Sequence, residues 1–187
     1  MNALLPQTQT YLIGLIGLLA IVAVVVAIQV IRVRRDEQAL IRLEKSGAAS
    51  SKEASKLYEL ASVQLRKRLY PQAIASLRKA LKLLVGEPDE AKALIENALG
   101  FALAAQKDYA AAVRHYQSAL QAKADYPVAL NNLAFAQERL EQEAEAYELY
   151  QKALVLDPKN KTARKHVKRL EKTQRTNSPK PADGQGF

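Results

Sequence analysis

The sequence repeats itself with a period of about 34 residues, a length typical of stacked helical repeats. Six positions occur twice at this spacing, as Leu99, Gly100, Ala112, Tyr116, Ala119 and Leu120 and then as Leu133, Ala134, Ala146, Tyr150, Ala153 and Leu154. A third copy with the same internal spacings lies upstream at a slightly larger offset, at Leu60, Ala61, Ala73, Leu77, Ala80 and Leu81. A unit of this length buries its apolar face by stacking on its neighbours, and small residues let the helices approach closely. The period therefore predicts an all-α solenoid of three helical hairpins.

These copies resemble the tetratricopeptide repeat (TPR), including Pro158 after the segment "YQKALVLD". The repeats are expected within residues 52–160, at about 54–87, 93–126 and 127–160, with about five extra residues in the first connection. The chain departs from the TPR pattern at the Trp position, where Leu57, Glu96 and Leu130 stand, and at Ala124, where Pro is usual. The resemblance implies a concave surface lined by the first helix of each hairpin.

The segments around the repeats have compositions of their own. The Ser/Gly/Ala run at 46–51 predicts a break, and Ser50 followed by Glu53 has the form of a capping box, which predicts a helix start nearby. Residues 161–174 are expected to form a capping helix with a basic outer side. The stretch at 175–187 combines Pro and Gly with almost no apolar residues, and we expect it to be disordered.

One apolar segment covers residues 11–33, interrupted only by Gly14, Gly17, Gln29 and Arg32. Twenty-one residues of helix span roughly 31 Å, which matches the ~30 Å hydrocarbon core of a bilayer. A cleaved signal peptide would have a basic start and an apolar core of about 7–15 residues, and this segment has neither. We therefore predict an uncleaved transmembrane helix.

The charges around this segment predict its orientation. Arg32, Arg34 and Arg35 follow the span, whereas no Lys or Arg precedes it. Because basic residues stay on the cytoplasmic side, residues 1–10 should form a short non-cytoplasmic N-terminus. Residues 34–51 are then a basic juxtamembrane helix and linker, and the repeats lie on the cytoplasmic or stromal side.

The net charge of +9 is not spread evenly, because both ends are basic and residues 88–158 are net acidic. The basic stretch at 159–175 lacks interleaved aromatic residues and any nucleic-acid recognition motif. We therefore expect no nucleic-acid partner. The stretch is either a solvated cap or a surface for an acidic protein face or anionic headgroups.

Nothing in the sequence predicts catalysis. The absence of Cys excludes thiolate nucleophiles and Cys-based metal sites. The only histidines, His115 and His166, belong to no catalytic or metal motif and are expected on helix surfaces. The dense carboxylates are expected on a turn and on outer helical faces, at Glu138, Glu141, Glu143, Glu145 and Glu148. We expect no enzyme, no cofactor and no small-molecule substrate.

A partner-binding groove is the expected functional site. Equivalent positions of the first helices carry Asn97 and Asn131, then Phe101 and Phe135, and Glu138 and Arg139 follow one turn later. Asn can bond a peptide backbone as both donor and acceptor, and Phe can supply an apolar anchor. In the alternative, the two Phe rings only pack the floor of the groove.

Several stretches resemble one family of anchored TPR proteins: "LLPQTQTYLIGL", "KRLYPQAIASLRKALK", "ENALGFALA", "DYPVALNNLAFAQE" and "LDPKNKTARKHVKRLEK". They resemble the thylakoid TPR protein of cyanobacteria and plastid genomes that assists photosystem I assembly and is related to the pale-yellow-green factor of plants. The resemblance covers about residues 5–172. It implies a thylakoid anchor, a stroma- or cytoplasm-facing solenoid and transient binding of photosystem I subunits or assembly intermediates. A membrane-anchored TPR adaptor for a different bacterial membrane or envelope complex is the alternative.

Overall fold

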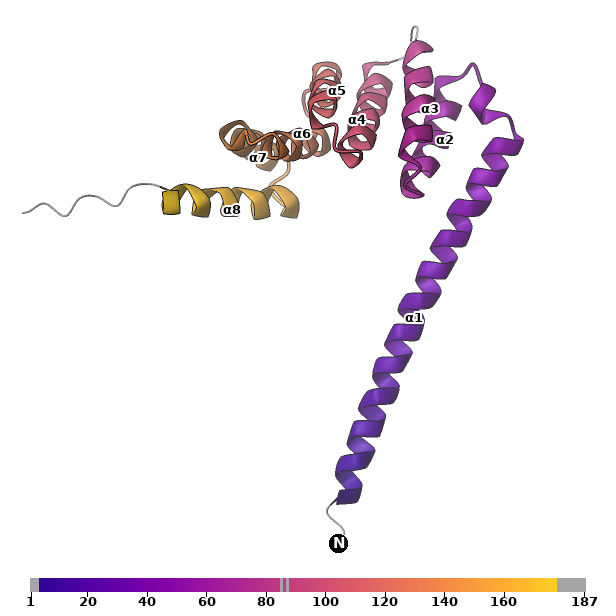
Figure 1. The fold of residues 1–187 in the computed structure, drawn as a ribbon, viewed down its shortest axis with the longest axis vertical. Helices are drawn as coiled ribbons and strands as arrows, with labels where there is room; N and C mark the ends of the chain where they lie inside the picture. Colours follow the sequence, from indigo (N-terminus) through magenta and orange to yellow (C-terminus); the bar gives the residue numbers. More distant parts are fainter. Residues whose placement is uncertain (1–3, 85, 87, 178–187) are drawn as a thin grey trace, which may run out of the picture. The chain divides into compact units, whose positions relative to one another are not determined.

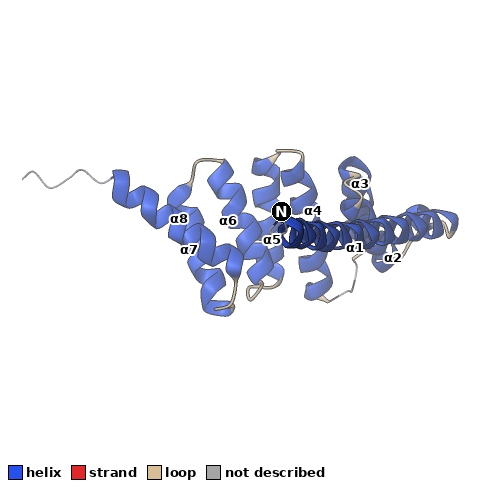
Figure 2. Cartoon of the chain, turned by 90° about the horizontal axis from the view of Figure 1, so that it is seen from below, coloured by secondary structure: helices blue, strands red, loops and turns tan. Residues whose placement is uncertain are grey.

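The computed structural model describes residues 4–84, 86 and 88–177, and all regular elements in this part of the chain are helical (Figures 1 and 2). The prediction of an all-α fold is confirmed. The chain divides into two units, residues 1–47 and 48–187.

The first unit is a single helix, α1, which runs from Leu4 to Lys45 without interruption. It is long and apolar enough to cross a membrane, and its side chains from Gln9 to Val33 are all exposed. The residues after Val33 continue the same helix up to Lys45, and the Ser/Gly/Ala run at 46–51 follows its end. The helix ends at Lys45, and Gly47 just after it has a positive φ of 72°, which suits a residue without a Cβ.

The second unit begins with a 3-10 turn at Ala48–Ser50, and α2 starts only at Ala54. The predicted capping box of Ser50 and Glu53 is wrong, because Glu53 itself is the N-cap and makes no side-chain cap bond. A tertiary contact explains the difference. Ala48 is buried, and the Lys79 ammonium donates to the Ala49 carbonyl at 2.7 Å, which holds the turn where the helix would begin.

Six helices then form three consecutive hairpins (Figure 1). They are α2 (Ala54–Arg66) with α3 (Tyr70–Lys82), α4 (Asp89–Ala105) with α5 (Tyr109–Ala122), and α6 (Pro127–Arg139) with α7 (Glu143–Leu156). Each hairpin turn contains a residue with positive φ, namely Arg68, Lys107 and Glu141. Sequence reasoning missed this conformation because none of the three is Gly.

The helix α8 runs from Lys161 to Asn177, three residues beyond the predicted end of the capping helix. The Asn160 side chain caps its start by accepting from the Ala163 amide at 3.0 Å. The buried Ala163 and Leu170 lie one repeat period after the buried Ala129 and Ala136. In packing, α8 is therefore the first helix of a fourth hairpin. The expected disordered tail overlaps its last turn, and residues 178–187 lie outside the described residues.

The core consists of the periodic positions that predicted the fold. In the second hairpin a Cβ added to Gly100 would lie 2.7 Å from the buried ring of Tyr116, which is closer than real Cβ contacts allow. The equivalent residues in the third hairpin, Ala134 and Tyr150, are both fully buried. The close approach of α4 and α5 thus depends on the missing side chain at residue 100.

We predict that Gly100→Ala lowers the free energy of unfolding by about 1–2 kcal/mol, because overpacking costs about 1–3 kcal/mol and the better helix propensity of Ala returns up to about 1 kcal/mol. The measurement is chemical unfolding of the full chain, followed by circular dichroism. The control is Gly100→Ala in a Tyr116→Leu background, which reproduces the Ala61 and Leu77 pair of the first hairpin. There the same change should be neutral or stabilising; an equal cost in both backgrounds would refute the contact.

Candidate protein-interaction surface

A row of large apolar side chains is half-exposed on the first helices of the hairpins. The exposed fractions are 43% for Leu94, 45% for Phe101, 53% for Val128 and 44% for Phe135. Leu94 and Phe101 are two helical turns apart on α4, as are Val128 and Phe135 on α6, so each pair shares one helix face. We call these four residues the apolar row. Phe101 and Phe135 are thus half-exposed, an exposure that leaves both rings accessible to a partner.

The apolar row extends toward α2 through a surface hollow of about 150 Å³. It is lined by Ala54, Ser55, Tyr58, Leu84, Ala91, Leu94 and Ile95. Tyr58 occupies the first-hairpin position that matches Asn97, so the hollow continues the same face of the domain. Leu94 and Val128 were missed by sequence reasoning, although their apolar character and their equivalent places in successive repeats were visible signals.

The two predicted Asn residues are not equivalent in the structure. Asn97 donates to the Tyr126 hydroxyl at 3.3 Å and accepts from the Asn132 side chain at 2.9 Å. Burial raises the pKa of Tyr126, so this hydroxyl stays protonated. The Oδ1 atom of Asn131 is instead buried and accepts no hydrogen bond from the described residues. Asn97 therefore ties α4 to the following hairpin and is not free to hold a partner backbone in the predicted way.

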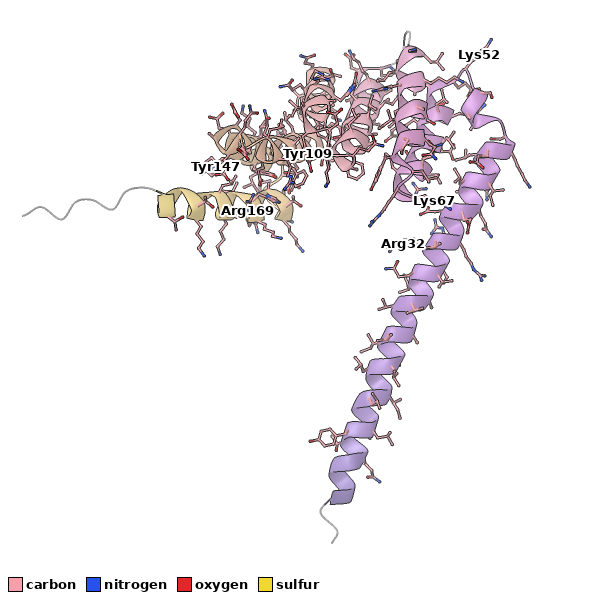
Figure 3. The ribbon with its side chains drawn as sticks, in the orientation of Figure 1. Arg32, Lys52, Lys67, Tyr109, Tyr147 and Arg169 are labelled. Atoms are coloured by element: carbon pink, nitrogen blue, oxygen red, sulfur yellow. The ribbon has the colours of Figure 1, made fainter. Side chains whose placement is uncertain are left out.

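Glu138 also differs from its predicted role, because only 10% of its side chain is exposed. It accepts from Nδ1 of His166 at 2.7 Å and forms an ion pair with Arg169, both on α8 (Figure 3). The His166 ring stacks on Tyr150 with centroids 4.8 Å apart. Burial, and then the charge of Lys165, lower the pKa of His166, which favours a neutral ring that donates to the carboxylate. Glu138 thus fastens α8 to α6 instead of facing a partner.

The other histidine is also more enclosed than predicted. His115 lies 2.6 Å from a carboxylate oxygen of Glu96, and the Glu96 residue is buried. Both histidines therefore form pairs between helices. The prediction of surface histidines is wrong. The carboxylate partners of His115 and His166 lie 19 and 28 residues away in the sequence, so no local pattern indicated the two pairs.

Arg139 is exposed and lies at the end of the apolar row. Its guanidinium is 5.4 Å from the centre of the Tyr109 ring, a cation–π distance. Tyr109, labelled in Figure 3, meets Phe135 edge-to-face with centroids 6.4 Å apart. Of the six predicted groove residues, Phe101, Phe135 and Arg139 are therefore open to a partner. Among the described residues there is no group of three or more side chains that could hold a metal ion.

The chain matches models of the tetratricopeptide repeat over residues 52–125 and 127–160. It is 37% identical over 114 residues to the ycf37 protein of Cyanophora paradoxa, which covers 60% of this chain and 64% of that one. It is 32% identical over 120 residues to the chloroplastic TPR protein PYG7 of Arabidopsis thaliana, and the match covers 64% of this chain and 38% of PYG7. It is 32% identical over 126 residues to ycf37 of Pyropia yezoensis, and the match covers 65% of this chain and 71% of that protein. The chain belongs to the ycf37/PYG7 family.

The chain spans less than two thirds of the Cyanophora and Arabidopsis members of the ycf37/PYG7 family. Among solved structures, the TPR domain of Arabidopsis OM64 has a TM-score of 0.58 and 24% identity, over 64% of this chain and 94% of that domain. This likeness concerns the fold. A TPR scaffold of this family is a protein-interaction adaptor.

In this member of the ycf37/PYG7 family we predict that Glu138→Ala loosens α8, because it leaves the partly buried His166 and the Arg169 charge without their acceptor. The expected loss is about 1–3 kcal/mol in local stability. Trypsin should then cut within the Lys- and Arg-rich α8 about tenfold faster. The control is Glu148→Ala, which removes an exposed carboxylate from α7. Equal cleavage rates for both variants would contradict the proposed fastening.

Proposed function

We propose that this protein is a noncatalytic, membrane-anchored scaffold that assists assembly or accumulation of photosystem I by holding its subunits or assembly intermediates. The observation that carries the proposal is the half-exposed apolar row on a domain whose chain also carries an apolar helix of spanning length. Monomeric soluble domains rarely leave such a row uncovered without a partner. Membership of a family with a chloroplastic TPR protein supports a photosynthetic setting.

The character of α1 supports the proposed anchor. Its apolar side chains at 11–33 are exposed in the chain itself, and a bilayer would cover them. Arg32, Arg34 and Arg35 follow the apolar stretch, and by the positive-inside rule they orient the repeats toward the cytoplasm or stroma. Together with the chloroplastic relative, these features support a proposed location in the thylakoid membrane, with the TPR unit on the cytoplasmic or stromal side.

Binding through the apolar row is tested by Phe101→Ala with Phe135→Ala. Truncating a buried aromatic anchor typically costs an interface about 1–2 kcal/mol or more, so capture of photosystem I subunits should fall at least tenfold. The measurement is isolation of the tagged full chain from gently solubilised thylakoids, with immunoblots for photosystem I subunits. Val155→Ala is the control, since Val155 is a highly exposed apolar residue on a second helix, α7.

Two results would contradict the proposal at different levels. Unchanged capture by the double Phe variant would place the contacts elsewhere on the domain. Capture of subunits of another membrane complex, with none of photosystem I and normal photosystem I levels in a deletion strain, would overturn the photosystem I role and favour the adaptor alternative.

The anchor is tested by Val22→Lys with Val25→Lys. Each Lys near the middle of a span costs about 2.5–3.5 kcal/mol, and two of them offset most of the insertion free energy of this helix. The wild-type chain should stay in thylakoid membranes after carbonate washing, whereas the double Lys variant should be released. The control is Val22→Ala with Val25→Ala, which should remain in the membrane. Release of the wild-type chain would refute an integral anchor.

A further inference from the structure

The face that carries the apolar row continues onto α8 with a different chemistry. One repeat period after Val128 and Phe135 stand Thr162 and Arg169, and one period after Asn131 and Glu138 stand Lys165 and Lys172. Lys165, Arg169 and Lys172 are exposed. We call these three the basic end of the face. The buried Ala163 and Leu170 place α8 in the register of a first helix, so this equivalence is structural as well as sequential.

Two contacts connect the basic end to the apolar row. Arg169 pairs with Glu138, which lies on α6 one turn after Phe135. Arg139 lies over Tyr109, whose ring in turn contacts Phe135. Two carboxylates at this junction are partly buried and already partnered: Glu138 by Arg169 and His166, and Glu171 by the Tyr147 hydroxyl. Lys165, Lys172 and Arg139 therefore add positive charge beside the last apolar side chain.

We infer that this face takes a protein segment with bulky apolar side chains at one end and clustered carboxylates at the other. The apolar part lies against α4 and α6, and the carboxylates lie against α8. The charge complementarity of the basic end selects an acidic segment, while the half-exposed Leu94, Phe101, Val128 and Phe135 provide sites for apolar anchors. This inference rests on the proposed function, because it describes the partner of the same surface.

The arrangement favours a protein segment over a lipid surface. A helix that lies in a bilayer interface inserts its own apolar face, but Ala163 and Leu170 of α8 are buried in the domain core. The apolar side chains of the face stand on α4 and α6, whereas Lys165, Arg169 and Lys172 stand on α8. An elongated ligand that is apolar in one half and acidic in the other matches this separation.

The test uses the full chain in nanodiscs of zwitterionic lipid and three labelled peptides of equal length. The peptides share one apolar half containing Phe and Leu, and the other half carries four Glu, four Gln or four Lys. In fluorescence anisotropy the Glu peptide should bind about tenfold tighter than the Gln peptide, and the Lys peptide should bind most weakly. Because the selection is electrostatic, a NaCl concentration of about 0.5 M should remove most of the difference.

Matched variants test whether the preference for the Glu peptide over the Gln peptide depends on α8. Lys165→Glu and Lys172→Glu should each weaken the Glu peptide about three- to tenfold and leave the Gln peptide unchanged, and Lys165→Gln should have a smaller effect in the same direction. The control is Lys168→Glu, an equal charge change at an exposed residue that matches Gly100 and Ala134, positions facing a second helix. It should leave both peptides within twofold. Phe101→Ala should weaken both peptides equally.

Several outcomes would overturn the inference. They are equal binding of the three peptides, equal effects of Lys165→Glu and Lys168→Glu, and failure of all peptides to bind while anionic vesicles or single-stranded DNA bind in a Lys165-dependent manner. If the Lys variants bind the Glu peptide as tightly as the wild type does, but the double Phe variant no longer captures photosystem I subunits, this inference fails and the proposed function stands. If neither the Lys variants nor the double Phe variant weakens binding, this inference fails and the contacts with photosystem I subunits lie elsewhere on the domain.

Discussion

The spacing between the two helices of a hairpin governs the rest of the second unit. Gly100 lies directly against the Tyr116 ring, and Ala134 and Tyr150 occupy the equivalent buried places. This close approach turns one side of each first helix entirely toward its own hairpin. Phe101 and Phe135 lie about 100° further around their helices, outside this contact, and remain half-exposed. The apolar row therefore borders the side of each first helix that packs within its own hairpin.

The packing of the hairpins also explains why polar contacts hold α8. It stacks on the third hairpin through Ala163 and Leu170, as α6 does through Ala129 and Ala136, but no second helix follows it within the described residues. The end of the stack therefore depends more on polar contacts. Glu138, His166 and Arg169 supply them, and Tyr147 adds a hydrogen bond to Glu171 at 3.2 Å. Cations on α8 serve both to hold this helix and to charge the end of the interaction face.

The parts of the fold that depend on helix period were predictable from the sequence. Leu99, Tyr116 and their equivalents are buried because the repeat places them at the same packing site in each hairpin. Individual polar partners were not predictable in this way. The Asn97 side chain is hydrogen-bonded by Tyr126 and Asn132 on neighbouring segments, whereas Oδ1 of Asn131 accepts no hydrogen bond from the described residues. The capping box failed because the Glu53 amide donates to the Ser51 hydroxyl and not to Ser50, and because Lys79, far along the sequence, donates to a carbonyl of the preceding turn.

The anchor and the interaction face make complementary physical contributions. A modest apolar row buries less than a large obligate interface and so favours transient binding. Proposed attachment to the membrane raises the effective concentration of any partner in the same bilayer, which lets weak contacts suffice for capture. Release then needs only the loss of a few side-chain contacts, without unfolding of the repeats. An assembly scaffold requires this combination, because it must meet its client repeatedly and must also let the finished complex go.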